Sequence, residues 1–280
     1  MWKEVPRAAT GTFYHVDAPA IGDTLEISVI EPFPGAASVG KQFPAIYVLD
    51  PSATLDIVVG TKRLFDIFSG GSLPLAYIVG IGYADPDVTG RRFRDFTPSE
   101  APLPDGISLA SPLGLGGASR YLAFIRDEIV PHLESILPLA PHERALLGYS
   151  LSGLFAAHVL FRHPDAFDRY LVISPSLWWD NASIFKDEET WAGSNADLPA
   201  KVLFVVGDAE EQPGGDWRNN LPDEVVLPLK PVSHVRGLSN RLASRRYAGL
   251  RMKTAFIPGG RHITVFPAAV GLGLVEMFAL

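Results

Sequence analysis

The sequence predicts one α/β domain in which a mostly parallel sheet is covered by helices on both faces. Short apolar runs rich in β-branched and aromatic residues recur along the chain, and each ends at Gly, Pro, Ser or Asp, which is typical of buried parallel strands. Helical patterns lie between these runs, and strands that alternate with helices form parallel sheets. The 280 residues show no internal repeat or break in composition, so we expect a single domain over residues 1–280.

The expected strands follow from the pattern of each run. Residues 23–32 alternate apolar and polar side chains, as a half-buried strand does. The other runs are nearly continuously apolar, which predicts strands buried on both faces. These strands are expected at residues 44–50, 75–83, 144–150, 169–176 and 201–208 and, with a weaker pattern, at 253–259.

The expected helices are read from apolar residues at helical spacing. Residues 119–136 show this spacing, and residues 151–163 show it up to Pro164, which ends the helix. Two more helices are expected at 232–248 and 264–280. Three turn-rich stretches fit neither pattern, at 84–117, 177–199 and 209–223. We expect the first two to be lid-like loops, because long loops in such enzymes often shape the site.

Composition excludes several function classes. The net charge of −7 disfavours binding to nucleic acid or to an anionic membrane surface. The absence of cysteine rules out disulfides, thiolate zinc sites and a cysteine nucleophile. No apolar run approaches the ~18 residues of a membrane helix. The first residues lack the apolar core of a secretory signal, so we expect a cytoplasmic protein.

The segment "ALLGYSLSGLFAAH" (residues 145–158) contains the candidate nucleophile, Ser150. A predicted strand precedes this serine and a predicted helix follows it, which is the context of a nucleophile elbow. The elbow needs small neighbours, and Gly148 and Ser152 meet that need. An ordinary tight turn that contains serine is the alternative. The context favours a catalytic Ser150 at the carboxyl edge of the sheet, where chemistry gathers in parallel sheets.

A serine nucleophile needs a base, and His262 is the best placed of the seven histidines. It lies in the Gly-rich segment "PGGRHITVFP" after the last expected strand, where the base of this arrangement belongs. A solvated loop histidine is the alternative interpretation, and His234 is the next candidate for the base.

The acid that orients the base should lie between the serine and the histidine. The segment "VLFVVGDAEEQ" offers Asp208, Glu210 and Glu211 after an expected strand. Asp208 is still leaving the sheet, whereas the chain has had room to reverse by Glu210. Glu210 is therefore the preferred acid, with Asp208 as the alternative and a Ser–His dyad as a third possibility.

Two further segments carry candidate substrate-binding residues. Residues 91–95, "RRFRD", place arginines after an expected strand, and Arg94 is the candidate contact to an anionic substrate. An Arg–Asp pair that pins a surface loop is the alternative. Trp178 and Trp179 follow the strand after the elbow helix. They are expected either to line an acyl or aryl pocket or to pack within a lid.

Seven segments, in order, carry a family resemblance over residues 46–269. They are "PAIYVLDP", "RRFRDFTPS", "GGASRYLAFIRDEIVPHLE", "LLGYSLSGLFA", "ISPSLWWD", "VVGDAEE" and "GGRHITVFPAA". The chain thereby resembles the α/β-hydrolase esterases related to enterobactin esterase, including the siderophore hydrolases, and more distantly esterase D and the mycolyltransferases.

The resemblance implies an α/β-hydrolase fold with Ser150 as nucleophile, His262 as base and Glu210 as acid. It also implies an oxyanion hole made by the amides of Leu151 and Ser52. Two positions depart from the family pattern, because Pro51 and Ser152 stand where the family usually has glycine.

These observations predict a serine esterase that acts on a small-molecule ester, with a siderophore-type ester or lactone as the sharpest substrate hypothesis. Triad chemistry requires neither a metal nor a cofactor, and we expect none. An acyltransferase of the same fold and an inactive binding protein are the alternatives. The sequence predicts no oligomeric state.

Overall fold

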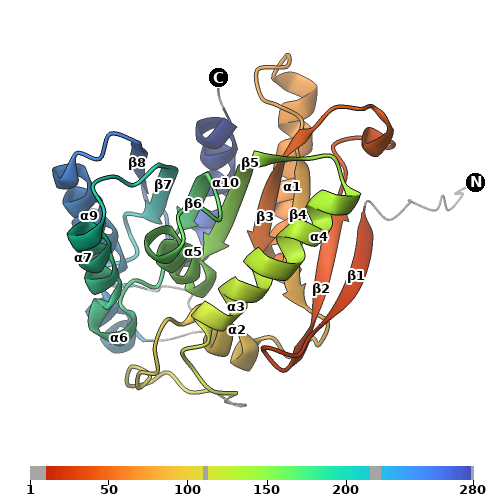
Figure 1. The fold of residues 1–280 in the computed structure, drawn as a ribbon. Helices are drawn as coiled ribbons and strands as arrows, with labels where there is room; N and C mark the ends of the chain where they lie inside the picture. The colour runs from red at the N-terminus through yellow and green to blue at the C-terminus, as the bar shows by residue number, and fades with distance from the viewer. Residues whose placement is uncertain (1–10, 110–112, 215–221, 279–280) are drawn as a thin grey trace, which may run out of the picture.

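One eight-stranded sheet forms the centre of the computed structural model, which describes residues 11–109, 113–214 and 222–278. Its strand order is β1-β2-β4-β3-β5-β6-β7-β8 (Figure 1). Strands β3 to β8 run parallel to one another, while β2 pairs antiparallel with both β1 and β4. The strands are β1 (Thr12–Ala18), β2 (Asp23–Ile30), β3 (Phe43–Leu49), β4 (Tyr77–Tyr83), β5 (Leu139–Tyr149), β6 (Arg169–Ile173), β7 (Ala200–Gly207) and β8 (Leu250–Ile257). The predicted mostly parallel sheet is confirmed.

Strand β1 was not expected from the sequence. It lies at the edge of the sheet and pairs with β2 from Thr12 opposite Val29 to Ala18 opposite Asp23. Most of its side chains are exposed. An edge strand with few buried side chains lacks the alternation by which a half-buried strand is recognised, so no strand was predicted there.

Helices cover both faces of the sheet (Figure 1). The apolar residues of α1 (Pro51–Phe68) and α10 (His262–Phe278) share one buried cluster with alternate strand residues. The other cluster joins the remaining strand residues to α3 (Ala118–Phe124), α4 (Val130–Ile136), α5 (Leu151–Arg162) and α9 (Pro231–Arg245). Helix α1 was missed by the sequence reading because it is rich in β-branched residues and contains Gly60, which lower helix propensity. Packing of Leu55 and Val58 onto the sheet compensates.

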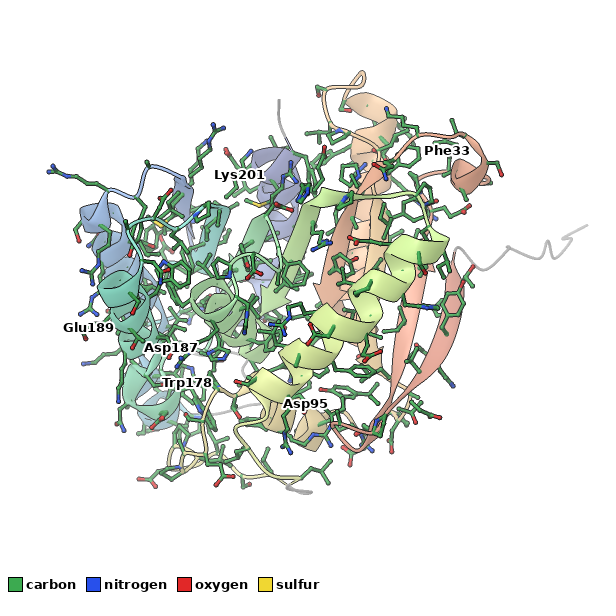
Figure 2. All side chains as sticks on the ribbon, viewed as in Figure 1. Phe33, Asp95, Trp178, Asp187, Glu189 and Lys201 are labelled. Carbon is green, nitrogen blue, oxygen red and sulfur yellow. The ribbon has the colours of Figure 1, made fainter. Side chains whose placement is uncertain are left out.

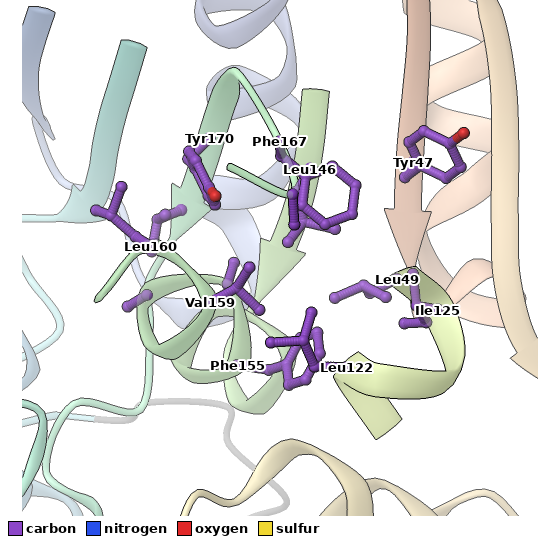
Figure 3. Close-up of a cluster of buried hydrophobic side chains, with 14 of the residues drawn as sticks. Tyr47, Leu49, Leu122, Ile125, Leu146, Phe155, Val159, Leu160, Phe167 and Tyr170 are labelled. Atoms are coloured by element: carbon purple, nitrogen blue, oxygen red, sulfur yellow. The ribbon is translucent and has the colours of Figure 1, made fainter. Parts of the chain in front are cut away.

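The two core clusters follow from the period of the strands. In β5, Leu146 faces the α5 side, whereas Ala145 and Leu147 face the α1 side, because successive strand residues point to opposite faces. Figure 3 shows the α5 side, where Leu146 and Tyr170 of the sheet lie opposite Phe155 and neighbouring side chains of α5. Burial of each large apolar side chain contributes about 1.5–3 kcal/mol to the stability of the fold. The packing of α5 on the sheet therefore fixes the position of Ser150, the residue before this helix.

The predicted helix at 119–136 is present but interrupted. Helices α3 and α4 are joined by a π-helical turn at Ile125–Ile129. Pro131 follows this turn and lacks the N–H that an α-helix would donate to the carbonyl four residues earlier. The wider turn accommodates that missing hydrogen bond without breaking the helical rod.

Both expected lid-like loops contain helices, and the second is mostly helical, which corrects part of the loop assignment. Residues 84–117 include α2 (Thr89–Phe96), and residues 177–199 include α6 (Trp179–Ala182) and α7 (Ile184–Ser194). The highly charged sequence of α2 obscured its helical period. The two segments also pack on each other, since Ser99 Oγ donates to Asp180 Oδ2 at 2.6 Å. The third stretch, 209–223, lies partly outside the described residues and ends where α8 (Asp223–Val226) begins.

Candidate active site

Ser150 lies between the end of β5 and the start of α5, as predicted. Its backbone angles are φ 61° and ψ −116°, a region that L-residues rarely adopt and that costs on the order of 1–3 kcal/mol. The end of β6 holds this conformation in place. The Ser150 amide donates to the Ile173 carbonyl, and the Ser176 amide donates to the Ser150 carbonyl, both at 3.0 Å. The strained turn is thus fixed from outside by a neighbouring strand.

The close packing around Ser150 explains its small neighbours. A Cβ atom at Gly148 would lie 2.1 Å from the Ser152 carbonyl oxygen, and one at Gly153 would lie 3.0 Å from the Ile173 carbonyl oxygen. A second steric requirement thus falls on Gly153, which the sequence analysis did not select. Ser152 is fully buried and has room for its hydroxyl.

The hydroxyl of Ser152 connects the elbow to the start of α1. It donates to Asp50 Oδ2 at 2.8 Å and accepts from the Tyr149 amide at 3.0 Å. Arg92 holds the same Asp50 carboxylate through two hydrogen bonds, of 2.6 Å to Oδ1 and 3.0 Å to Oδ2. Burial acts to lower the pKa of Arg92, but the Asp50 carboxylate outweighs it and raises that pKa above its usual value. The pair of Arg92 and Asp50 joins α2, the start of α1 and the elbow.

His262 and Glu210 meet Ser150 in one continuous chain of hydrogen bonds. His262 Nε2 lies 3.0 Å from Ser150 Oγ, and His262 Nδ1 lies 2.9 Å from Glu210 Oε2. Both the histidine and the glutamate are buried, with exposed fractions of 5% and 0%. The structure brings together the three residues that the sequence analysis selected for a triad.

Hydrogen-bond donors hold the buried carboxylate of Glu210 in place. Its Oε1 accepts hydrogen bonds from the Ser174 hydroxyl at 2.5 Å and from the Gly207 amide at 2.9 Å. A buried charge is tolerated only where such partners replace water. These donors leave Oε2 facing His262.

Asp208, the alternative acid, faces elsewhere. Its side chain is exposed, and its Oδ1 accepts the Gly259 amide at 2.7 Å. The carboxylate thus secures the turn that leads from β8 toward His262. A Cβ atom at Gly207 would lie 2.1 Å from the Gly260 carbonyl oxygen, so the two loops approach as closely as backbones can. Glu210, two residues beyond Asp208, is the carboxylate that contacts the imidazole.

The imidazole of His262 is held by Tyr149 as well as by Glu210. The Tyr149 ring stacks on it with centroids 4.9 Å apart, and the Tyr149 hydroxyl donates to the His262 carbonyl at 2.6 Å. His262 is the first residue of α10 and not part of a loop before the helix, as the sequence suggested. This contact therefore joins the residue before the nucleophile to the start of the last helix.

The two expected oxyanion-hole amides lie at the first turns of two helices. Leu151 begins α5, and Ser52 is the second residue of α1. Amides in the first turn of a helix have no acceptor within it, and the helix end carries partial positive charge. Pro51 takes the first position of α1, which suits proline. A Cβ atom at Gly82 would lie 2.6 Å from the ring of Pro51. The departure from the family pattern is thus accommodated by a glycine on β4.

Arg94 is placed differently from the expectation that it contacts substrate. Its guanidinium is buried and binds Asp95 at 2.8 and 2.6 Å and Asp23 at 3.2 Å. The hydrogen bond with Asp95 raises the pKa of Arg94. Arg91 likewise binds Asp23 and Asp85. The arginines of α2 are thus ion-paired within the protein. For Arg94, the structure agrees with the alternative interpretation, in which an Arg–Asp pair holds this segment in place.

The two tryptophans, Trp178 and Trp179, have different surroundings. Trp179 is 1% exposed, packs against Phe93, and donates its indole N–H to Ser99 at 3.3 Å, so it belongs to the packing between the two lid segments. Trp178 is partly buried, and among the described residues its indole N–H has no hydrogen-bond partner. Figure 2 shows Trp178 and Asp95 at the edge of the sheet where the parallel strands end. Trp178 remains a candidate contact to substrate.

Within the described part of the chain, no group of three or more His, Asp or Glu side chains is arranged to hold a metal ion. In the same part, no helix combines the length and the hydropathy needed to span a bilayer.

Comparisons with known proteins place this geometry in context. The family model described as "Putative esterase" matches residues 18–221. The chain is 29% identical over 240 residues to the ferri-bacillibactin esterase BesA of Bacillus subtilis, covering 83% of this chain and 78% of that protein. It is 31% identical over 254 residues to the siderophore triacetylfusarinine C esterase of Aspergillus fumigatus, covering 84% and 81%.

The fold comparison agrees with the sequence comparison. The crystal structure of BES protein from Bacillus cereus superposes with a TM-score of 0.81 at 27% identity, and the alignment covers 100% of both chains. The predicted family and the predicted α/β-hydrolase fold are confirmed.

Proposed function

The chain belongs to this esterase family and is a carboxylic-ester hydrolase, and we propose that Ser150, His262 and Glu210 are its catalytic triad. The observation that carries the proposal is the unbroken hydrogen-bond chain from Ser150 Oγ through both imidazole nitrogens to Glu210. The order Ser, acid, His along the sequence is that of α/β-hydrolases.

In the first half of the reaction, Ser150 Oγ attacks the ester carbonyl carbon while its proton moves to His262 Nε2. The imidazolium that forms donates its Nδ1–H to Glu210, which stabilises its charge and fixes the ring. The tetrahedral intermediate collapses when His262 gives the Nε2 proton to the leaving alkoxide, and an acyl-serine remains.

In the second half, water replaces the alcohol. His262 Nε2 takes a proton from the attacking water and returns it to Ser150 Oγ as the acyl–oxygen bond breaks. The products are a carboxylic acid and regenerated enzyme. In both halves, the amides of Leu151 and Ser52 stabilise the oxyanion, aided by the positive ends of α5 and α1.

We further propose that the substrate is an ester of the siderophore class. Support comes from two relatives named as siderophore esterases, at 29% and 31% identity over most of this chain. Because Arg91, Arg92 and Arg94 are already ion-paired, recognition by free positive charge in α2 is not part of the proposal. The indole N–H of Trp178 is buried, so the proposed contact to the substrate is the partly exposed face of its ring.

The test is a hydrolysis panel run on the wild-type enzyme and on Ser150→Ala. The panel contains p-nitrophenyl esters of increasing chain length and a siderophore trilactone in its ferric and iron-free forms. We expect turnover of the trilactone at a higher kcat/KM than of any p-nitrophenyl ester, and labelling of the wild type by a fluorophosphonate. Turnover of simple esters alone would contradict the substrate proposal, and absence of both turnover and labelling would contradict the triad. Adding an acceptor alcohol separates hydrolysis from acyl transfer.

A further inference from the structure

A cleft lies at the opposite edge of the sheet from Ser150. It has a volume of about 680 Å³ and is lined by residues at the starts of β3, β6, β7 and β8. Figure 2 shows Lys201 at this edge, at the other end of the strands from Trp178. Four cations line the cleft, Lys41, Arg169, Lys201 and Arg251, together with two carboxylates. This positive local balance contrasts with the net charge of −7 of the whole chain.

Three of these cations stand in one row across neighbouring strands. Arg169 of β6 pairs in register with Lys201 of β7, which pairs with Arg251 of β8. Residues paired in register point to the same face of a sheet, and adjacent strands lie roughly 4.8 Å apart. Like charges directly opposite one another destabilise a sheet. A row of three cations therefore calls for a compensating negative charge.

The described residues around the row compensate it only in part. The C-terminal end of α10 lies over it, where the Met277 carbonyl accepts from Lys201 Nζ at 3.4 Å, and such a helix end carries about half a negative charge. Glu143 approaches Arg169 only to 3.9 Å. Asp168 also lines the cleft and accepts the Arg144 amide, and Glu276 pairs with Lys253 while its charge also favours the charged form of Lys201.

Two local features indicate that neighbouring groups do not fully neutralise the positive charge of the row. Among the described residues, the buried Nη1 atom of Arg169 has no hydrogen-bond partner, although a guanidinium has five N–H donors to place. Burial lowers the pKa of Lys201, and the neighbouring charge of Arg169 lowers it further. The folded protein thus holds Lys201 where its positive charge is disfavoured.

We propose that this cleft binds a small oxyanion with several negative charges, such as a diphosphate or a tricarboxylate. Two guanidinium groups flanking an ammonium match such a group, because Arg forms paired hydrogen bonds with phosphate or carboxylate oxygens. The phenyl ring of Phe278 lies against Arg169, 5.2 Å from its Cζ atom, and steadies the guanidinium. The site is separate from the esterase centre and does not depend on the triad assignment.

The test measures the melting temperature of the whole protein against pyrophosphate or citrate, with sodium chloride at matched ionic strength as the reference. We expect a saturable rise of about 5 °C for the wild type, since a ligand that binds only the folded state stabilises it. Lys201→Gln and Arg251→Gln should each raise the half-saturating concentration of the anion at least tenfold. Arg63→Gln, an exposed cation on α1, is the matched control and should respond like the wild type.

The same variants give a second readout without any ligand. At low salt and with no multivalent anion, Lys201→Gln should melt at or above the wild-type temperature, because it relieves repulsion within the row. A lower melting temperature would mean that the row is already neutralised in the folded protein and would overturn the proposal. An equal anion response in all three variants would also overturn it. The ratio of the pyrophosphate and citrate responses identifies whether phosphoryl or carboxylate groups are preferred.

Discussion

At the carboxyl edge of the sheet, Arg92 meets Asp50 and Glu210 meets His262, whereas at the amino edge Arg169, Lys201 and Arg251 stand beside one another. The first arrangement holds its charged groups in place before any substrate arrives, and such preorganisation is what favours a developing oxyanion. The second arrangement leaves positive charges that nearby negative groups balance only in part. The same sheet therefore holds paired charged groups at one edge and a row of cations that is compensated only in part at the other.

The largest expected effect is at the nucleophile. Ser150→Ala should abolish ester hydrolysis and fluorophosphonate labelling while changing the free energy of unfolding by less than about 1 kcal/mol, because the variant keeps the backbone and loses one hydroxyl. Hydrolysis assays, labelling and denaturant melts check this. Ser135→Ala, at an exposed serine, should leave all three measurements unchanged. Full activity of Ser150→Ala would exclude the elbow as the catalytic centre.

The next effect separates the two carboxylates after β7. Glu210→Gln should lower kcat by roughly 10²–10⁴ with little change in KM, because the residue orients the imidazole and stabilises its charged form. Asp208→Asn should cost less than about tenfold, since its carboxylate secures a turn. Steady-state kinetics of both variants test the ranking. The reverse order would move the role of acid to Asp208, and two mild effects would favour a dyad.

A smaller effect is expected where the elbow is tied to α1. Ser152→Ala removes the hydrogen bond to Asp50 and should lower kcat by about tenfold, with KM nearly constant, because the Ser52 amide is then less firmly placed. The unfolding free energy should fall by about 1 kcal/mol. An unchanged kcat would show that the elbow and the start of α1 are positioned independently.

Trp178→Phe keeps an aromatic side chain but replaces the indole with a smaller phenyl ring. We expect KM for the preferred ester to rise by about three- to tenfold at similar kcat, in line with the loss of apolar contact to the substrate. Trp191→Phe is the control, because its indole N–H donates to the Asp197 carbonyl within the protein. That variant should lose some stability and keep its KM. Equal KM values for Trp178→Phe and the wild type would assign Trp178 to packing.

The smallest effect concerns the amino edge. Arg251→Gln should leave hydrolysis of p-nitrophenyl esters within about twofold of the wild type, because the row lies at the opposite ends of the strands from Ser150. A large loss of activity in this variant would break the contrast between the two edges and would require a coupling between them.

Local pattern was sufficient for much of this molecule. The apolar runs of β3 to β7 and the strand–turn–helix at Ser150 are short-range features, and each was placed within a few residues. Position also selected Glu210, because two more residues beyond Asp208 allow the chain to reverse. Strand β1 and helix α1 were missed because β1 is mostly exposed and α1 depends on packing to offset weak propensity.

Contacts between residues far apart in the sequence could not be predicted from local patterns. Arg94 pairs with the adjacent Asp95, as the alternative interpretation of the sequence allowed, but its second contact, to Asp23, spans 71 residues and no local pattern signals it. The contact from Ser152 to Asp50 spans 102 residues and was equally hidden. The row of cations appears only once the register of β6, β7 and β8 is known.

The hydrogen bond between Ser150 and His262 closes a separation of 112 residues, and this has a consequence for folding. The elbow needs β6 to hold its backbone, and the imidazole needs β8 and the start of α10 to reach it. Contacts of such long range form late and slow the folding of a chain. Recovery of esterase activity after dilution from denaturant should therefore follow the slowest refolding phase, while helix signals return earlier.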